Sequence, residues 1–118
     1  MISEILPSEA LEALAAGRAI ILDVRHKEEV DFSHIPQDFI WIEMSELESK
    51  FNQLPRDKEI LCLCRTGGRS GGAAEFLSKK GFAAKNMRGG IFSWSSIEPS
   101  VKKYVYFYEG EKLVVTEV

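Results

Sequence analysis

The chain contains Ile60-Leu61-Cys62-Leu63-Cys64-Arg65-Thr66-Gly67-Gly68-Arg69-Ser70, and this stretch decides the fold. The apolar run at its start predicts a buried strand that delivers Cys64 to its carboxyl end. Two glycines then let the chain turn, and we expect a helix to begin at about Ser70. Backbone N–H groups of such a turn, together with the positive end of the helix dipole, form a cradle for an anion. Cys64 is therefore a candidate nucleophile that exists as a thiolate or carries an anionic sulfur adduct.

Apolar segments alternate with helix-like segments on both sides of this stretch. Strands are expected over residues 2–6, 19–24, 39–42, 60–64 and 85–87, and helices over residues 7–17, 45–51 and 70–80. The run at 19–24 is uninterrupted and aliphatic, which is typical of a strand covered on both faces. The alternation predicts an α/β domain with a mostly parallel sheet. Ligands of such sheets bind beyond the carboxyl ends of the strands, which is where Cys64 falls.

Composition limits the possible functions. A chain of 118 residues with 45% hydrophobic and 28% charged residues is typical of one soluble globular domain. A net charge of −3 gives no support for binding nucleic acid. No apolar stretch is long enough to span a membrane, and residues 1–4 do not resemble a secretion signal, so we expect a cytoplasmic protein.

The two cysteines, Cys62 and Cys64, lie on one predicted strand, where a disulfide between them is geometrically poor. We expect free thiols in a reducing compartment, with Cys62 packed in the core and Cys64 reactive. A second, resolving role for Cys62 is the alternative. Neither His26 nor His34 lies in a cluster with metal-ligand spacing, so no metal site and no cofactor is expected.

Several motifs, in this order and spacing, resemble the rhodanese family of sulfurtransferases. They are Ile20-Ile21-Leu22-Asp23-Val24-Arg25, Phe32-Ser33-His34-Ile35-Pro36, the loop Cys64 to Ser70, the segment Ala73 to Phe82, Gly89-Gly90-Ile91-Phe92-Ser93-Trp94, and Ile97 to Tyr104. The chain departs from the family after Pro36, where Gln37 stands in place of the usual Gly. The resemblance implies a rhodanese-like domain over residues 1–104, with a five-stranded, mostly parallel sheet and helices on both faces.

The resemblance also implies a thiosulfate sulfurtransferase. In such an enzyme the Cys64 thiolate takes sulfane sulfur from thiosulfate or from a persulfide donor and passes it to an acceptor such as a thiol, cyanide or a protein. The residues after Cys64 are then expected to bind the substrate; they are Arg65, Thr66, Gly67, Gly68, Arg69 and Ser70.

Charged residues near this loop have two possible roles. Arg65 is expected to hold an oxyanion of the donor, whereas Arg69 either binds substrate or braces the loop by pairing with a carboxylate. Asp23 and Arg25 end the neighbouring strand and are expected to support the site. We expect Asp23 to accept hydrogen bonds from nearby loop N–H groups and Arg25 to pair with Glu28 or Glu29.

Two other functions are open. Cysteine phosphatases use a similar cradle, but their loop is one residue longer than the one between Cys64 and Arg69, because phosphate is bulkier than a sulfane sulfur. The second alternative is a sulfur-relay or binding module that acts only with a protein partner.

The C-terminal extension, residues 105–118, lies outside the resemblance. Two β-prone segments flank Gly110, which predicts a β-hairpin with Gly110 in its turn. A lone hairpin is marginal in water, so its apolar face must rest on the same domain or on a second copy in a dimer. We expect it to pack away from the Cys64 pocket, in a monomer or a homodimer.

Overall fold

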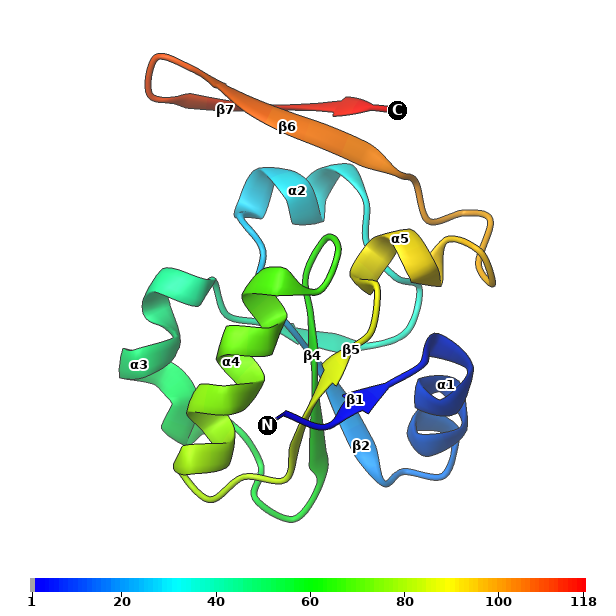
Figure 1. The fold of residues 1–118 in the computed structure, drawn as a ribbon, viewed down its shortest axis with the longest axis vertical. Coiled ribbons are helices and arrows are strands. Elements are labelled where there is room, and N and C mark those ends of the chain that lie inside the picture. The colour runs from blue at the N-terminus through cyan, green and yellow to red at the C-terminus, as the bar shows by residue number, and fades with distance from the viewer. Residues whose placement is uncertain (1) are drawn as a thin grey trace.

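The computed structural model describes residues 2–118 and contains a central five-stranded sheet (Figure 1). Its strands are β1 (Glu4–Ile5), β2 (Ala19–Asp23), β3 (Phe39–Trp41), β4 (Glu59–Leu63) and β5 (Ala84–Met87). They stand in the order β1-β5-β4-β2-β3, and every neighbouring pair is parallel. The predicted parallel sheet is thus confirmed, with β4 at its centre.

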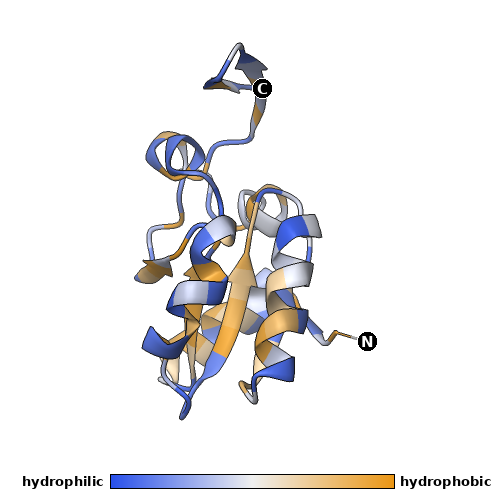
Figure 2. Cartoon of the chain, turned by 90° about the vertical axis from the view of Figure 1, so that its left-hand side faces the viewer, coloured by the Kyte–Doolittle hydropathy of each residue, from blue (hydrophilic) through white to orange (hydrophobic). Residues whose placement is uncertain are grey.

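Helices cover both faces of the sheet, as predicted (Figures 1 and 2). They are α1 (Pro7–Ala15), α2 (Lys27–Phe32), α3 (Leu47–Lys50), α4 (Gly68–Lys79) and α5 (Gly90–Trp94), with 3₁₀ turns at Met44–Glu46 and Phe51–Gln53 on either side of α3. α4 ends at the predicted point, because Gly81 adopts a left-handed conformation with φ of +90° just beyond it. α2 was not predicted, since its six residues are too few to display a helical period.

Side chains of β4 alternate between two hydrophobic cores. Leu61 and Leu63 point into the core that includes Ala10 of α1 and Trp94 of α5. Cys62 and Cys64 point into the opposite core, which α3 and α4 cover. The two-residue period of a strand therefore places both thiols on the α4 side of the sheet. In Figure 2 the apolar strands lie between helices whose polar faces point outward.

The C-terminal extension forms the predicted hairpin from β6 (Tyr104–Glu109) and β7 (Lys112–Glu117). Glu109 and Lys112 form the last pair before the turn, where Gly110 has a φ of +62°. The hairpin lies across one end of the domain, above α2 (Figure 1). Tyr104 is completely buried, and Tyr106 packs at the edge of the core that includes α1 and α5.

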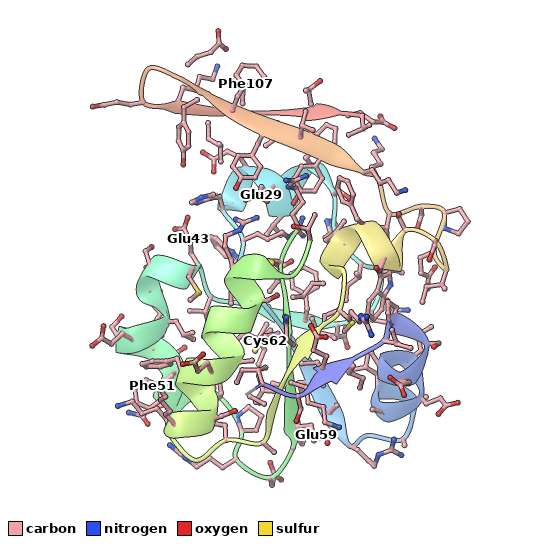
Figure 3. The ribbon with its side chains drawn as sticks, viewed as in Figure 1. Glu29, Glu43, Phe51, Glu59, Cys62 and Phe107 are labelled. Atoms are coloured by element: carbon pink, nitrogen blue, oxygen red, sulfur yellow. The ribbon has the colours of Figure 1, made fainter. Side chains whose placement is uncertain are left out.

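One expectation about this hairpin was wrong. It does not pack away from the Cys64 loop (residues 64–70), because the ring of Tyr106 lies over the guanidinium groups of Arg65 and Arg69. The opposite side of β6 is exposed at Val105 and Phe107. Figure 3 shows Phe107 on the hairpin. Within residues 2–118, no helix has both the length and the apolar composition that crossing a membrane requires.

Candidate active site around Cys64

Cys64 follows β4 directly, and its side chain lies at the base of the loop that leads into α4. The residue is only 1% exposed. Its Sγ accepts hydrogen bonds from the N–H groups of Gly67 at 3.1 Å and Ser70 at 3.3 Å, and Ser70 Oγ lies 3.2 Å away. These contacts place three donor groups around one sulfur, in the first turn of α4. Such an arrangement stabilises negative charge on the sulfur.

The helix begins at Gly68, slightly before the predicted start at Ser70. Gly67 takes a left-handed conformation with φ of +109°, which reverses the chain so that the first N–H groups of α4 point back at Cys64. A side chain at this φ would be strained, which explains why glycine stands there. The earlier start places the Ser70 N–H among the unpaired donors of the first turn.

A second turn, between β5 and α5, supports the Cys64 loop from behind. The N–H of Ile91 donates to the carbonyl oxygen of Cys64 at 2.9 Å, and the N–H of Phe92 donates to that of Arg65 at 3.2 Å. A Cβ at Gly90 would lie 2.4 Å from the Cys64 carbonyl oxygen, so only glycine allows this close approach. The glycine pair of the Gly-Gly…Trp motif thus fixes the backbone on which Cys64 sits.

Arg69 pairs with a carboxylate. Its two terminal nitrogens donate to the two oxygens of Glu29 at 2.7 Å and 2.8 Å, and the Glu29 side chain is fully buried on α2. Burial opposes the charged form of Glu29, but hydrogen bonds from Arg69 and Tyr104 outweigh it and hold the Glu29 pKa below its usual range. Of the two roles considered for Arg69, this geometry matches the bracing role.

Asp23 and Arg25 are both buried beside the loop, and they pair with each other. Asp23 accepts hydrogen bonds from the Arg25 side chain at 2.7 Å and from its backbone N–H at 3.0 Å. The expected ion pair of Arg25 with Glu28 or Glu29 is wrong, because Arg25 reaches only the backbone carbonyl of Glu29, at 3.4 Å. Its other contact is the hydroxyl of Tyr104, at 2.9 Å.

The remaining predicted residues of the loop are more exposed than Cys64. Arg65 is half-buried and lies over the rings of Phe92 and Tyr106, with its guanidinium carbon 5.2 Å and 5.6 Å from their centroids. Thr66 and Gly68 are exposed. The aromatic rings lie against the Arg65 guanidinium, and one of its terminal nitrogens donates to the carbonyl oxygen of Tyr104 at 3.4 Å.

Four residues of the site were not predicted in their observed roles: Asn86, Tyr104 and Tyr106 were not named as site residues, and Glu29 was expected to pair with Arg25 and not with Arg69. Asn86 accepts from Ser70 Oγ at 2.6 Å and donates to the carbonyl oxygen of Gly67 at 3.0 Å. The sequence gives no clear signal for it, because Lys85 beside it already makes this short strand polar. The other three come from α2 and β6, whose approach to the loop depends on tertiary packing.

The other candidate residues lie outside the cradle. His26 contacts Glu43, and His34 contacts the Val30 carbonyl oxygen, so neither forms a pair with Cys64. Cys62 is fully buried, and this burial raises the pKa of its thiol to about 12, with Cys64 nearby as a smaller cause. Both cysteines are free thiols. Among residues 2–118, no group of His, Cys, Asp and Glu has a metal-binding arrangement.

The family model of the rhodanese-like domain matches residues 6–97, and the chain therefore belongs to that family. A putative sulfurtransferase of Bacillus subtilis is 35% identical over 94 residues, which cover 79% of this chain and 90% of the relative. The crystal structure of a rhodanese-related protein from Thermoplasma volcanium is similar to this fold, with a TM-score of 0.74 and a sequence identity of 35%. The match covers 81% of this chain and 93% of that one.

A larger relative is also similar. A probable adenylyltransferase/sulfurtransferase of Mycobacterium tuberculosis is 32% identical over 106 residues, which cover 86% of this chain but 27% of the relative. The chain is thus similar to sulfurtransferases of about its own size and also to part of a longer protein. These relationships support sulfur transfer as the general chemistry of an enzyme in the rhodanese superfamily.

Proposed function

We propose that the protein is a thiosulfate sulfurtransferase that carries sulfane sulfur as a persulfide on Cys64. The observation that carries this proposal is the convergence of the Gly67 N–H, the Ser70 N–H and the Ser70 hydroxyl on Cys64 Sγ. Preorganised donors of this kind stabilise an anionic sulfur without a general base. Both Cys64 and Cys62 are free thiols, which fits a reducing compartment such as the cytoplasm.

In the first half-reaction the Cys64 thiolate attacks the outer sulfur of thiosulfate. The sulfur–sulfur bond of thiosulfate breaks, and its electron pair leaves with sulfite. The product is a Cys64 persulfide that carries the single negative charge the thiolate carried before. The N–H groups of Gly67 and Ser70 donate to Cys64 Sγ, the sulfur that carries the charge before the reaction.

In the second half-reaction an acceptor, cyanide or a thiolate, attacks the outer sulfur of the persulfide. The bond between that sulfur and Sγ breaks, and its electron pair returns to Cys64. Thiocyanate or a new persulfide leaves, and the thiolate is restored. The same donors now stabilise Cys64 as a leaving group, so one cradle serves both half-reactions.

Arg65 and Arg69 have different roles in this proposal. Arg65 binds the oxyanion of the donor, because no carboxylate among residues 2–118 forms an ion pair with it and its guanidinium donates only to the Tyr104 carbonyl oxygen. Arg69 holds the loop in place through Glu29, and its fixed charge adds to the positive potential at the sulfur. Thr66 and Gly68 complete the exposed rim through which donor and acceptor enter.

A protein acceptor is a second candidate. The similarity to an adenylyltransferase/sulfurtransferase supports a relay in which Cys64 passes its sulfur to another protein. The chemistry at Cys64 is the same in both cases, and only the acceptor differs. Turnover with a small acceptor such as cyanide favours the free-standing enzyme, whereas a stable persulfide without turnover favours the relay.

Intact mass spectrometry after incubation with thiosulfate tests the proposal. We expect the chain to gain one sulfur atom, and cyanide to remove it with formation of thiocyanate. Cys64→Ser should gain none, and Cys62→Ala serves as the matched control that still gains it. Hydrolysis of an aryl phosphate that depends on Cys64, with no sulfur gained, would instead identify a phosphatase.

A further inference from the structure

Behind Cys64 lies a buried chain of three polar groups. Cys64 Sγ is 3.2 Å from Ser70 Oγ, which is 2.6 Å from Asn86 Oδ1. The three residues are 1%, 0% and 6% exposed, so hardly any solvent reaches these groups. Asn86 comes from β5, next to β4 in the sheet, and Ser70 from the first turn of α4. The hydrogen-bond partners of these three groups must therefore come from the protein and not from water.

The orientation of the Asn86 amide is fixed by its second contact. Its Nδ2 donates to the carbonyl oxygen of Gly67 at 3.0 Å, which can only accept. Oδ1 therefore faces Ser70 and can only accept as well. The Ser70 hydroxyl has one proton, and two acceptors compete for it when Cys64 is ionised: the Asn86 oxygen and the sulfur.

We propose that Asn86 is a positioning residue that directs the Ser70 hydroxyl, and thereby sets how strongly the site stabilises the Cys64 thiolate. When Cys64 is a thiol, its S–H donates to Ser70 Oγ and the Ser70 hydroxyl donates to Asn86. When Cys64 is a thiolate, the hydroxyl turns to the sulfur and the buried Asn86 oxygen loses its donor. Asn86 thus favours the neutral thiol, and its presence restrains ionisation that the cradle otherwise promotes.

This arrangement has a consequence for sulfur transfer, which rests on the function proposed above. The inner sulfur of a persulfide is bonded to a second sulfur and needs no hydroxyl donor, so the Ser70 hydroxyl returns to Asn86. When the acceptor removes the outer sulfur, charge develops on Sγ and the hydroxyl turns back to it. A thiolate that is stabilised too strongly is a weaker nucleophile, so the competition keeps Cys64 reactive in the first half-reaction.

The other charged groups around Cys64 do not change when the Ser70 hydroxyl turns between Asn86 and the sulfur. Arg69 on α4 stays paired with Glu29 of α2, and the Arg65 guanidinium lies against the ring of Tyr106 on β6. Cys62, on the same strand, stays neutral because burial raises its pKa to about 12. None of these groups contacts Ser70 Oγ or the Asn86 side chain, whose hydrogen bonds lie within the Cys64 loop and β5.

The test measures the rate at which iodoacetamide alkylates Cys64 as a function of pH, and the midpoint of this pH profile is compared between variants. All variants also carry Cys62→Ala, so that Cys64 is the one thiol that can react. Asn86→Ala frees the Ser70 hydroxyl for the sulfur and should lower the midpoint by about half a pH unit, the size expected from one hydrogen bond. Ser70→Ala should raise it. In the Ser70→Ala background, adding Asn86→Ala should produce no further lowering, because the hydroxyl through which Asn86 acts is gone.

A purely structural role for Asn86 predicts the opposite sign. Losing its bond to Gly67 would loosen the loop, weaken the Gly67 N–H bond to the sulfur and raise the midpoint. The proposal would be overturned if Asn86→Ala left the midpoint of the pH profile unchanged or raised it. It would also be overturned if Asn86→Ala lowered the midpoint equally in the presence of Ser70 and in the Ser70→Ala background. Asn86→Ser is the second variant if Asn86→Ala does not fold, and the exposed Asn52→Ala is the matched control. Alkylation uses no sulfur donor, so a failure of the proposed function would leave this test intact.

Discussion

The Tyr104 hydroxyl donates a 2.6 Å hydrogen bond to Oε2 of Glu29, the same oxygen that accepts from Arg69 at 2.8 Å. One buried carboxylate therefore joins the C-terminal hairpin to the Cys64 loop. Arg25 donates to the Tyr104 hydroxyl from the other side and is itself held by Asp23. Figure 3 places Glu29 between the hairpin and the body of the domain. The hairpin is thus part of the structure that supports the Cys64 loop.

Tyr104→Phe should test this connection. The substitution keeps the buried ring and removes only the hydroxyl, which leaves Glu29 without one donor and Arg25 without one acceptor. We expect the free energy of unfolding to fall by ~2 kcal/mol, the cost of leaving buried partners of charged groups unpaired. Urea denaturation measures this loss. Tyr108→Phe, at an exposed position of the same strand, should have almost no effect.

Acid should weaken the same network. The folded-state pKa of Glu29 lies below its ordinary value of 4.5, so the carboxylate stabilises the fold fully above that value. This contribution is lost as the pH falls through the lower folded-state pKa. The stability difference between the wild type and Glu29→Gln should therefore be largest near neutral pH and shrink below about pH 4.5. A difference that stayed constant across this range would show that charge on Glu29 contributes nothing.

Cys64→Ser should abolish sulfur transfer from thiosulfate to cyanide and leave the thermal unfolding temperature nearly unchanged. Cys62→Ala should keep most of the activity, because Cys62 points into the core and its raised thiol pKa keeps it un-ionised. Thiocyanate formation measures both. If Cys62→Ala were the inactive variant, the assignment of the nucleophile would be wrong.

Local signals explain why so much of the fold could be predicted. The aliphatic run of β4 and the glycines after Cys64 specify a strand, a turn and a helix within a few residues. Such features can be read from the sequence because each needs only its sequence neighbours. The glycine pair at Gly89 and Gly90 differs, because its role against the Cys64 carbonyl depends on a contact between distant segments.

The rest of the site depends on contacts between distant segments. Glu29 and Tyr104 are 75 positions apart, and nothing near either residue indicates a buried pair. α2 reads as a charged surface segment, although Glu29 faces inward. The hairpin was predicted from its own residues, but the side of the domain on which it packs is decided by Tyr104 and Tyr106 meeting α2 and the Cys64 loop.

Tyr106 should affect substrate binding more than stability. Its ring lies 5.6 Å and 5.4 Å from the guanidinium carbons of Arg65 and Arg69, and it is only half-buried. Tyr106→Ala removes a face on which Arg65 rests, so the free side chain samples more conformations and holds the anionic donor less well. We expect KM for thiosulfate to rise about twofold to fivefold, the size of one exposed cation–π contact, with a smaller change in kcat.

Steady-state kinetics with thiosulfate as the varied substrate measure the effect of Tyr106→Ala, and Tyr106→Phe is the matched control. Phe keeps the ring and should keep the wild-type KM, because the contact is with the aromatic face and not the hydroxyl. Deleting residues 106–118 should reproduce the rise in KM and lower the unfolding temperature as well, since Leu113 and Val115 are lost from the packed side of the hairpin. Wild-type kinetics in the deletion would mean that the hairpin supports the fold alone and takes no part in binding the donor.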